Sequence, residues 1–405
     1  MCLKIAIRNV FRNKVRTIIT LLAITFGCMS LILIGGFIHD ALTTYRDSII
    51  YSRLGHIQIA KKGFFKEGTI KPFDYMIDNP EELREALDSL DHIERITPRL
   101  QFVGLLSKGE TTFPFLAEGI DPAGEKSLSS YIEFEKGENL SKGDNYTIIL
   151  GKGLARAIGA DVGDDMIILT NTIEGGMNAL DVKVKGIFYT SSKEYDDHFL
   201  RIPVRTAQYL LQTEKVQKFI VILDKTANLK KVTNRLDDFF VKNNLPLEYK
   251  TWFDLAEFYN KLVAVYERQL KVINIIIYII VILSISNTMS MAIFERTREI
   301  GTIMALGAKR HEVLFLFILE GAVLGAIGSL LGIGGGIFFA HLISWIGIPM
   351  PPGPGISVGW IGKIAVVPAV VCISFFLCMI SAVISSFYPA FKASRLNVAE
   401  ALRYV

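Results

Sequence analysis

Hydrophobic positions along the chain fall into four long runs, separated by segments rich in polar residues. The first run has no charged residue, the third contains only Glu320, and the fourth is uncharged; the runs cover residues 17–38, 272–294, 313–343 and 364–388. A bilayer core of roughly 30 Å needs about 20 apolar residues of helix. We therefore predict four transmembrane helices. The first run could instead be a cleaved signal peptide, but its length and the lack of a small-x-small cleavage site favour a retained helix.

Residues 40–268 have short alternating and amphipathic patterns, which predict a mixed α/β domain. The polar stretch 124–145 is expected to separate two lobes. A helix is predicted to start with Asn79 as its cap, Pro80 in its first turn and Glu82 three residues after the cap, and to run to Leu90. Further helices are predicted over 151–159 and 228–243, and His56–Ala60 alternates like a half-buried strand. Other strands are predicted over 93–97, 101–107, 111–119, 166–171, 182–189 and 219–223.

The end of this domain forms a stalk, residues 252–270, whose apolar positions recur at helical spacing. The stripe includes Leu255, Phe258, Leu262 and Tyr266, with no Pro or Gly among them. It continues without a break into the second apolar run, which favours one long helix. The alternative is a bent pair of helices with a loop near Arg268.

Charge separates the same parts of the chain. The 405 residues have a net charge of +4, with 51% hydrophobic and 21% charged residues. Residues 40–268 carry 30 Lys and Arg against 35 Asp and Glu, a net of −5, and the remaining 176 residues carry 14 against 5, a net of +9. This partition disfavours a plain cytosolic enzyme, a disordered protein and a nucleic-acid binder.

Short-loop Lys and Arg counts predict the orientation in the membrane. Basic residues concentrate in residues 1–16, 295–310 and 389–405, which are therefore placed in the cytoplasm with both termini. The loop 344–362 and the domain 40–268 are placed outside. All four cysteines lie beyond that domain, which therefore depends on its core and not on disulfides.

Motifs for chemistry are missing from the sequence. It contains no GxxxxGK[ST] loop, HExxH, CxxC or GxSxG. Asp196-Asp197-His198 is interpreted as a solvated turn, because no further ligand accompanies it at site-like spacing. We predict that the chain is not an enzyme and itself holds no catalytic residue, metal or cofactor.

The stretch Phe294–Arg310 (FERTREIGTIMALGAKR) has charges of alternating sign and an apolar face formed by Ile300, Ile303, Met304 and Leu306. Glu295 and Glu299 lie one helical turn apart. A docking helix for a cytoplasmic partner fits this pattern, and an interfacial helix on lipid headgroups is the alternative. The amphipathic N-terminal helix, residues 1–16, is expected to touch anionic lipid headgroups.

Small residues recur along the third run at spacings of three or four, which permits close helix packing in a bilayer. They are Gly321, Gly325, Gly328, Gly332 and Gly336. Glu320, at the start of this series, is a candidate polar contact.

Three segments together carry a family resemblance: IAIRNVFRNKVRTIITLLAITFG near the start, ERTREIGTIMALGAKRHEV in the loop, and YPAFKASRLNVAEALRYV at the end. They resemble FtsX-like and MacB-type ABC transporter permeases. The one-plus-three helix layout, the large outer domain and the lack of a fused ATPase most resemble the lipoprotein-releasing LolC/LolE permeases. The resemblance implies an α-helical membrane protein with four transmembrane helices and a large MacB-like periplasmic domain, built of a porter-like lobe and a second α/β lobe.

The resemblance also implies a mechanism, mechanotransmission, as in type VII ABC transporters. A separate cytoplasmic ATPase dimer, which binds ATP and Mg²⁺, would move the coupling helix, and the stalk would pass that movement to the outer domain. Partners would be a second permease copy or paralogue and membrane lipids, with a periplasmic adaptor or acceptor as an optional further partner, in a bacterial inner membrane. The ATPase-contact motif falls on Glu295, Arg298, Glu299, Gly301, Gly307 and Ala308.

Three functions follow from these patterns. An export permease for lipoproteins or another lipid-like cargo fits the large outer domain and the stalk. MacB-like tripartite efflux of peptides or small molecules is an alternative, as is an FtsX-like transmembrane regulator of an envelope hydrolase.

Overall fold

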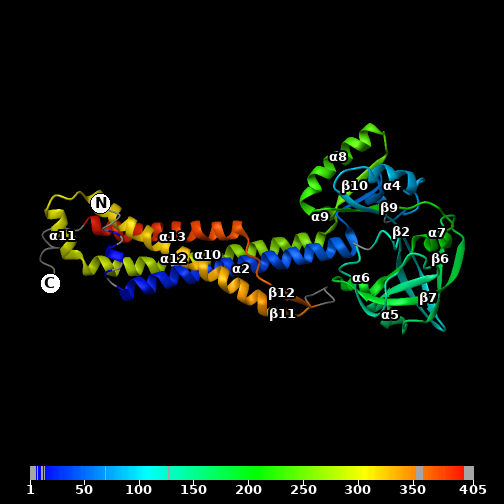
Figure 1. Ribbon diagram of the computed structural model, residues 1–405, viewed down its shortest axis with the longest axis horizontal. Helices are drawn as coiled ribbons and strands as arrows, with labels where there is room; N and C mark the ends of the chain where they lie inside the picture. Colours follow the sequence, from blue (N-terminus) through cyan, green and yellow to red (C-terminus); the bar gives the residue numbers. More distant parts are fainter. Residues whose placement is uncertain are drawn as a thin grey trace. The chain divides into compact units, whose positions relative to one another are not determined.

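The chain forms two compact units (Figure 1). We call residues 1–43, 262–349 and 361–405 the helical unit, and residues 44–261 and 350–360 the sheet unit. The structure is a computed structural model that describes residues 6, 8–10, 12, 14–68, 70–125, 128–352 and 359–395. Much of the predicted N-terminal helix, part of the loop 344–362 and the tail beyond Arg395 therefore lie outside the described residues.

Within the described residues, four helices are long and apolar enough to cross a membrane, as the sequence predicts. They are α2 (Lys14–Ile49), α10 (Glu257–Glu295), α12 (Arg310–Ile346) and α13 (Pro368–Ser394). The fourth helix begins at Pro368, not at Ile364 as predicted, because the fixed φ of proline suits a first helical turn. Two short strands, β11 (Ile348–Met350) and β12 (Trp360–Gly362), pair with each other.

The predicted glycine series packs α12 against two different helices. A Cβ added at Gly321 or Gly325 would lie within 2.8 Å of Ser386 or Ala382 on α13. Gly328, Gly332 and Gly336 instead approach Ile24, Cys28 and Ile32 on α2, where an added Cβ would lie 2.6–3.2 Å from those side chains. These glycines therefore let backbones approach closely on two faces of one helix.

The sheet unit contains a ten-stranded mixed sheet in the order β10-β1-β9-β2-β3-β8-β5-β7-β4, with β6 pairing β2 and β7. The pairs β3–β8 and β5–β7 are parallel. The strands are β1 (Ile57–Lys61), β2 (Ile93–Lys108), β3 (Thr111–Ile120), β4 (Glu133–Gly137), β5 (Thr147–Gly151), β6 (Asp165–Asn171), β7 (Met177–Tyr189), β8 (Phe199–Pro203), β9 (Lys218–Leu223) and β10 (Leu247–Thr251).

Short helices accompany this sheet. They are η1 (Ile50–Leu54), α3 (Phe64–Glu67), α4 (Pro80–Asp88), α5 (Lys152–Ile158), α6 (Lys193–His198), α7 (Val204–Leu211), η2 (Thr226–Asn228), α8 (Leu229–Lys242) and α9 (Trp252–Leu255). Three of the predicted helices correspond to α4, α5 and α8. Asn79 precedes α4 as expected, but its side chain makes no capping bond to the backbone and instead donates to the Glu82 carboxylate.

Two strand predictions need correction. The run His56–Ala60 is not half-buried, because β1 lies between β10 and β9 and its first four residues are buried. The two strands predicted over 93–97 and 101–107 are one strand, β2. Pro98 lies inside β2, opposite Phe219 of β9, and does not interrupt it.

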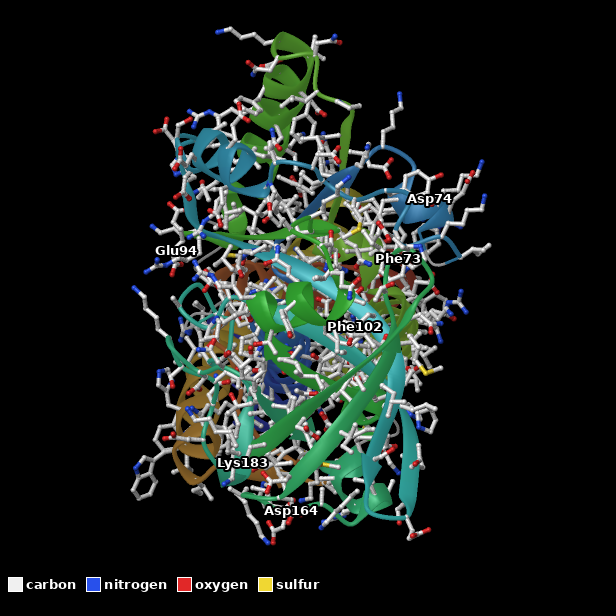
Figure 2. The ribbon with its side chains drawn as sticks, turned by 90° about the vertical axis from the view of Figure 1, so that its right-hand side faces the viewer. Phe73, Asp74, Glu94, Phe102, Asp164 and Lys183 are labelled. Atoms are coloured by element: carbon white, nitrogen blue, oxygen red, sulfur yellow. The ribbon has the colours of Figure 1, made fainter. Side chains whose placement is uncertain are left out.

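Buried apolar side chains of the sheet unit gather in separate clusters. The largest includes Leu100, Phe102, Leu150, Ile168 and Leu200. Figure 2 shows the unit with its side chains and labels Phe102, which stacks edge-on against Phe115 across β2 and β3. A second cluster lies under α4 and α8 and includes Leu87, Phe219 and Leu236.

The stalk is helical but not from its first residue. Leu255 ends α9, Ala256 leaves the helical conformation, and α10 then runs without interruption from Glu257 through Phe258, Leu262 and Tyr266. The bend near Arg268 considered from the sequence is therefore not found. A capping box of Thr251 and Asp254 fixes the start of α9.

Candidate functional site

The segment between α10 and α12 forms a short separate helix, α11 (Thr297–Ala305). Arg296 lies between α10 and α11 and interrupts the helix there, because its backbone has φ −105° and ψ 13°. After α11, Gly307 has φ +100°, a conformation that glycine adopts without steric cost, and Lys309 N–H donates to Glu312 at the start of α12. The helix predicted over 295–310 is therefore present but shorter: Glu295 belongs to α10, and Ala308 follows α11.

The apolar residues of α11 point to two sides. Ile300 is buried and Met304 is partly buried against the helix bundle, and Gly301 is also buried. Ile303 is 46% exposed, and Leu306, which follows α11 as its C-cap, is 84% exposed. The single apolar face predicted from the sequence is thus divided between a packing side and an exposed side. Among the predicted ATPase contacts, Gly301 lies on the packing side, whereas Arg298 is exposed.

Glu299 and Glu295 pair with arginines near the start of the chain. Arg12 donates to both carboxylate oxygens of Glu299, and Arg16 donates to Glu295. The hydrogen bonds from Arg12 hold the pKa of Glu299 below its ordinary value. Lipid headgroups are therefore not the only partners of the N-terminal bases.

A second polar contact lies beneath this pair. The buried Glu320 of α12 accepts from Asn9 Nδ2 at 2.7 Å and from Arg296 Nη1 at 3.3 Å, and Arg296 Nη2 donates to the Asn9 carbonyl at 2.9 Å. The residue that breaks the helix between α10 and α11 is thus bonded to both α12 and the N-terminal segment. Glu320 makes the polar contact that the sequence suggests.

The arginine partners were not identified from the sequence. One signal was available: Arg12 and Arg16 are four residues apart, as are Glu295 and Glu299. On a helix that spacing places both members on one face. The two pairs run in opposite directions, because Arg12 meets Glu299 and Arg16 meets Glu295. We call these four residues the charge ladder.

The other candidate residues lie in the sheet unit. Asp196 is not in a solvated turn as predicted: it is buried in α6 and accepts from Thr190 N–H at 2.9 Å and Thr190 Oγ1 at 2.8 Å. Its role is to hold the preceding loop. Within the part of the chain that the structure describes, no group of three His, Cys, Asp or Glu residues could hold a metal ion.

An apolar groove of about 540 Å³ lies on the sheet unit over β2, β3, β6 and β7. Val103, Leu105 and Met177 line it and are 64%, 47% and 78% exposed.

The stalk residue Phe258 is also half-exposed, and its ring meets Tyr45 edge-on, with 6.2 Å between the ring centroids.

Two family models match the chain. The MacB-like periplasmic core domain matches residues 17–239, and the FtsX-like permease C-terminal domain matches residues 271–398. The chain belongs to the FtsX/MacB superfamily of ABC transporter permeases. It is a multi-pass membrane protein whose sheet unit is a large extracytoplasmic α/β domain of MacB type.

Named relatives of this permease fall into several groups. The macrolide export ATP-binding/permease protein MacB of Brucella melitensis is 27% identical over 98% of this chain, which spans 60% of that protein's length. The lipoprotein-releasing system transmembrane protein LolC of Xylella fastidiosa is 26% identical over 74% of this chain and 75% of LolC. The ABC transporter permease YtrF of Bacillus subtilis is 26% identical over 98% of this chain and 97% of YtrF.

A solved structure is also similar. The periplasmic region of MacB from Actinobacillus actinomycetemcomitans matches 51% of this chain and 93% of that structure, with 16% identity and a TM-score of 0.38.

Proposed function

We propose that this permease is the membrane subunit of a type VII ABC transporter, in which a separate ATPase drives movements of the extracytoplasmic domain. The observation that carries the proposal is the exposed side of α11. Leu306, the residue that follows α11 as its C-cap, is 84% exposed, and Ile303 on α11 is 46% exposed. Large apolar side chains held out in this way suit insertion into a pocket of a partner protein.

The packing side of α11 supports the same proposal. Ile300 is buried in the helix bundle, the charge ladder joins α11 to the N-terminal segment, and Arg296 joins its start to Glu320. A push on α11 would therefore reach α10, α12 and α2 together. Because α10 is an unbroken helix of 39 residues, it is a suitable element to carry displacement toward the stalk.

Partners and orientation complete the proposal. Residues 1–16, α11 and the chain end would face the cytoplasm of a bacterial inner membrane, because they hold the short-loop basic residues. An ATPase dimer would bind there with ATP and Mg²⁺, and a second permease copy or paralogue would complete the transporter. The proposed ATPase contacts are Glu295, Arg298, Glu299, Gly301, Gly307 and Ala308.

The cargo that we propose is a lipoprotein or another lipid-like molecule. The apolar groove over β2, β3, β6 and β7 supports an apolar cargo, and the relatives include proteins named for lipoprotein release. A photo-crosslinking amino acid at Val103 in the groove would test this in cells. Crosslinked lipidated species support the proposal. Small molecules or peptides would indicate MacB-like efflux, and a folded hydrolase would indicate an FtsX-like regulator.

The docking surface has its own test. Leu306→Glu in the full chain should abolish co-purification of the partner ATPase, whereas Leu306→Met should retain it. Both variants should insert into the membrane in wild-type amounts. If Leu306→Glu binds the ATPase as wild type does but loses affinity for anionic vesicles, then α11 is a lipid-binding helix and the docking proposal is wrong.

A further inference from the structure

Four charged side chains are buried together inside the sheet unit. They are Arg99 on β2, Glu118 on β3, Glu125 in the following loop and Arg201 on β8, each at most 2% exposed. Arg99 donates from its two terminal guanidinium nitrogens to Glu125, at 2.6 and 2.9 Å, and Arg201 Nε lies 3.6 Å from Glu118. Burial alone would raise the pKa of Glu118, but the adjacent Arg99 and Arg201 lower it to about 2.

Folding stability alone does not account for a cluster of this kind. Removing ions from water is costly, and apolar residues of the same volume are often equally stable or more stable in that place. The three strands β2, β3 and β8 are neighbours, and Glu118 lies directly opposite Arg201 in the pairing of β3 with β8. The cluster thus lies across the middle of the sheet, where a specific connection can be made.

That connection is made by Arg201. Its Nη2 donates to the Ser52 carbonyl at 2.7 Å, and its Nε donates to Tyr195 OH at 2.9 Å. Ser52 is in η1, the π-helical segment that follows α2 directly. The last carbonyls of a helix lack partners within the helix, so a buried guanidinium can fix that end in position.

Two further contacts hold the same segment. Arg53 lies over the rings of Tyr195 and Phe199, at 5.3 and 5.7 Å from their centroids. Ser48 Oγ, in the last turn of α2, donates to Ser191 Oγ at 2.8 Å. The continuation of α2 is thus joined to β8, to α6 and to the loop before α6 by polar contacts.

We propose that Arg201 is a positioning residue that fixes the end of the first membrane helix to the central strands β2, β3 and β8, so that displacement of that helix moves these strands. The inference rests on the proposed mechanotransmission function. It requires the contact between Arg201 and Ser52 to be mechanical, so a covalent bond at the same junction should replace it.

The test uses the full chain with its partner ATPase in nanodiscs. Hydrogen–deuterium exchange is compared between nucleotide-free and ATP-bound complexes. In wild type, ATP should change exchange in β2, β3 and β8. Arg201→Met should reduce that difference at least fivefold while ATPase binding stays at the wild-type level. Arg205→Met, which removes an exposed arginine from α7, is the matched control and should leave the difference unchanged.

A disulfide then separates a mechanical role from a structural one. Ser48→Cys and Ser191→Cys replace two hydroxyls that are 2.8 Å apart, so the two thiols would face each other. Combined with Arg201→Met, the pair should restore the ATP-dependent exchange difference when oxidised and lose it again when reduced. The single change Ser48→Cys should restore nothing in either state.

Arg53→Ala is the second test variant, to be used if Arg201→Met does not fold. Arg53 is exposed, so its removal should leave the fold intact and reduce the exchange difference by a smaller factor, which the oxidised disulfide reverses. A full exchange difference in Arg201→Met, or in Arg53→Ala where Arg201→Met is unfolded, overturns the inference alone. A wild type without any ATP-dependent difference contradicts the proposed function, and the inference with it.

Discussion

Arg12 donates hydrogen bonds from both terminal guanidinium nitrogens to the two carboxylate oxygens of Glu299. One turn along, Arg16 bonds Glu295. The two pairs connect the start of the chain to both sides of the helix break at Arg296, so the N-terminal segment and the α10–α11 corner are held in one arrangement.

We predict that reversing one charge of the ladder weakens coupling and that reversing both restores it. Arg12→Glu should lower ATP hydrolysis by the transporter complex several-fold, because two carboxylates would then face each other. The double variant Arg12→Glu/Glu299→Arg should recover most of the loss. The effect should shrink in high salt, since both side chains are about half exposed and salt screens such pairs.

Arg8→Glu provides the control, because it reverses an exposed charge on the same segment outside the ladder. If the double reversal is as impaired as Arg12→Glu alone, the pair does not connect these segments in the working transporter.

The membrane helices could be predicted because their signal is local. Each apolar run is long enough to span a bilayer by itself, and the prediction needed no knowledge of what the helix packs against. The helix break at Arg296 could not be predicted in the same way. Arg296 has no helix-breaking side chain, and its position follows from its bonds to Glu320 and to the Asn9 carbonyl.

Burial of the charged residues in the sheet unit was equally inaccessible. Arg99, Glu118, Glu125 and Arg201 have the composition of a solvated surface when read along the sequence. They are buried because the pairing of distant strands brings opposite charges together, as with Glu118 on β3 and Arg201 on β8, which lie directly opposite each other. The contrast between the buried Ile300 of α11 and the exposed Leu306 that follows it also depends on packing partners that a single helix does not specify.

Gly332 provides a prediction about packing between α12 and α2. A Cβ at this position would lie 2.6 Å from Cys28 Cβ and 2.9 Å from the Thr25 carbonyl. Gly332→Val should therefore destabilise the folded protein by about 1–3 kcal/mol, the usual cost of overpacking. Gly334→Val is the matched control, because nothing lies within 4 Å of its added Cβ and both sites are on the same helix. Denaturant titration in detergent micelles measures both; equal loss at the two sites would contradict the packing assignment.

Glu320 provides a prediction about the polar contact below the ladder. Glu320→Ala leaves the partly buried Arg296 without its carboxylate, and breaking such a pair costs about 3 kcal/mol. Glu320→Gln should cost less, because the amide oxygen can still accept from Asn9. Thermal unfolding of the purified chain should rank the variants wild type, Gln, Ala from most to least stable. An alanine variant as stable as wild type would show that Arg296 finds another partner.

The last prediction concerns His56, which is fully buried where β1 begins. Its Nδ1 accepts the Leu223 N–H at 3.2 Å, and Nε2 lies 3.0 Å from Thr226 Oγ1, so the neutral ring fits the site. Burial, followed by the nearby charge of Arg46, lowers the pKa of His56 from 6.5 to about 4.

The sign of the pH dependence follows from this shift. Between pH 6.5 and 4 the unfolded chain binds a proton at His56 that the folded protein does not bind. Stability from this residue is therefore complete above about pH 6.5 and falls as the pH drops toward 4, by about 3 kcal/mol in total. His56→Gln should remove this part of the pH dependence, whereas His92→Gln, at a half-buried position in the same unit, should retain it.

Tryptophan fluorescence provides the measurement, because the backbone N–H of Trp252 donates to the His56 carbonyl at 3.0 Å and its buried ring reports unfolding of this region. Denaturant midpoints at pH 7, 6, 5 and 4 should fall steeply for wild type and His92→Gln, and much less for His56→Gln. Parallel curves for all three proteins would mean that the pKa of His56 in the folded state is not lowered. The neutral buried ring would then be the wrong description of this site.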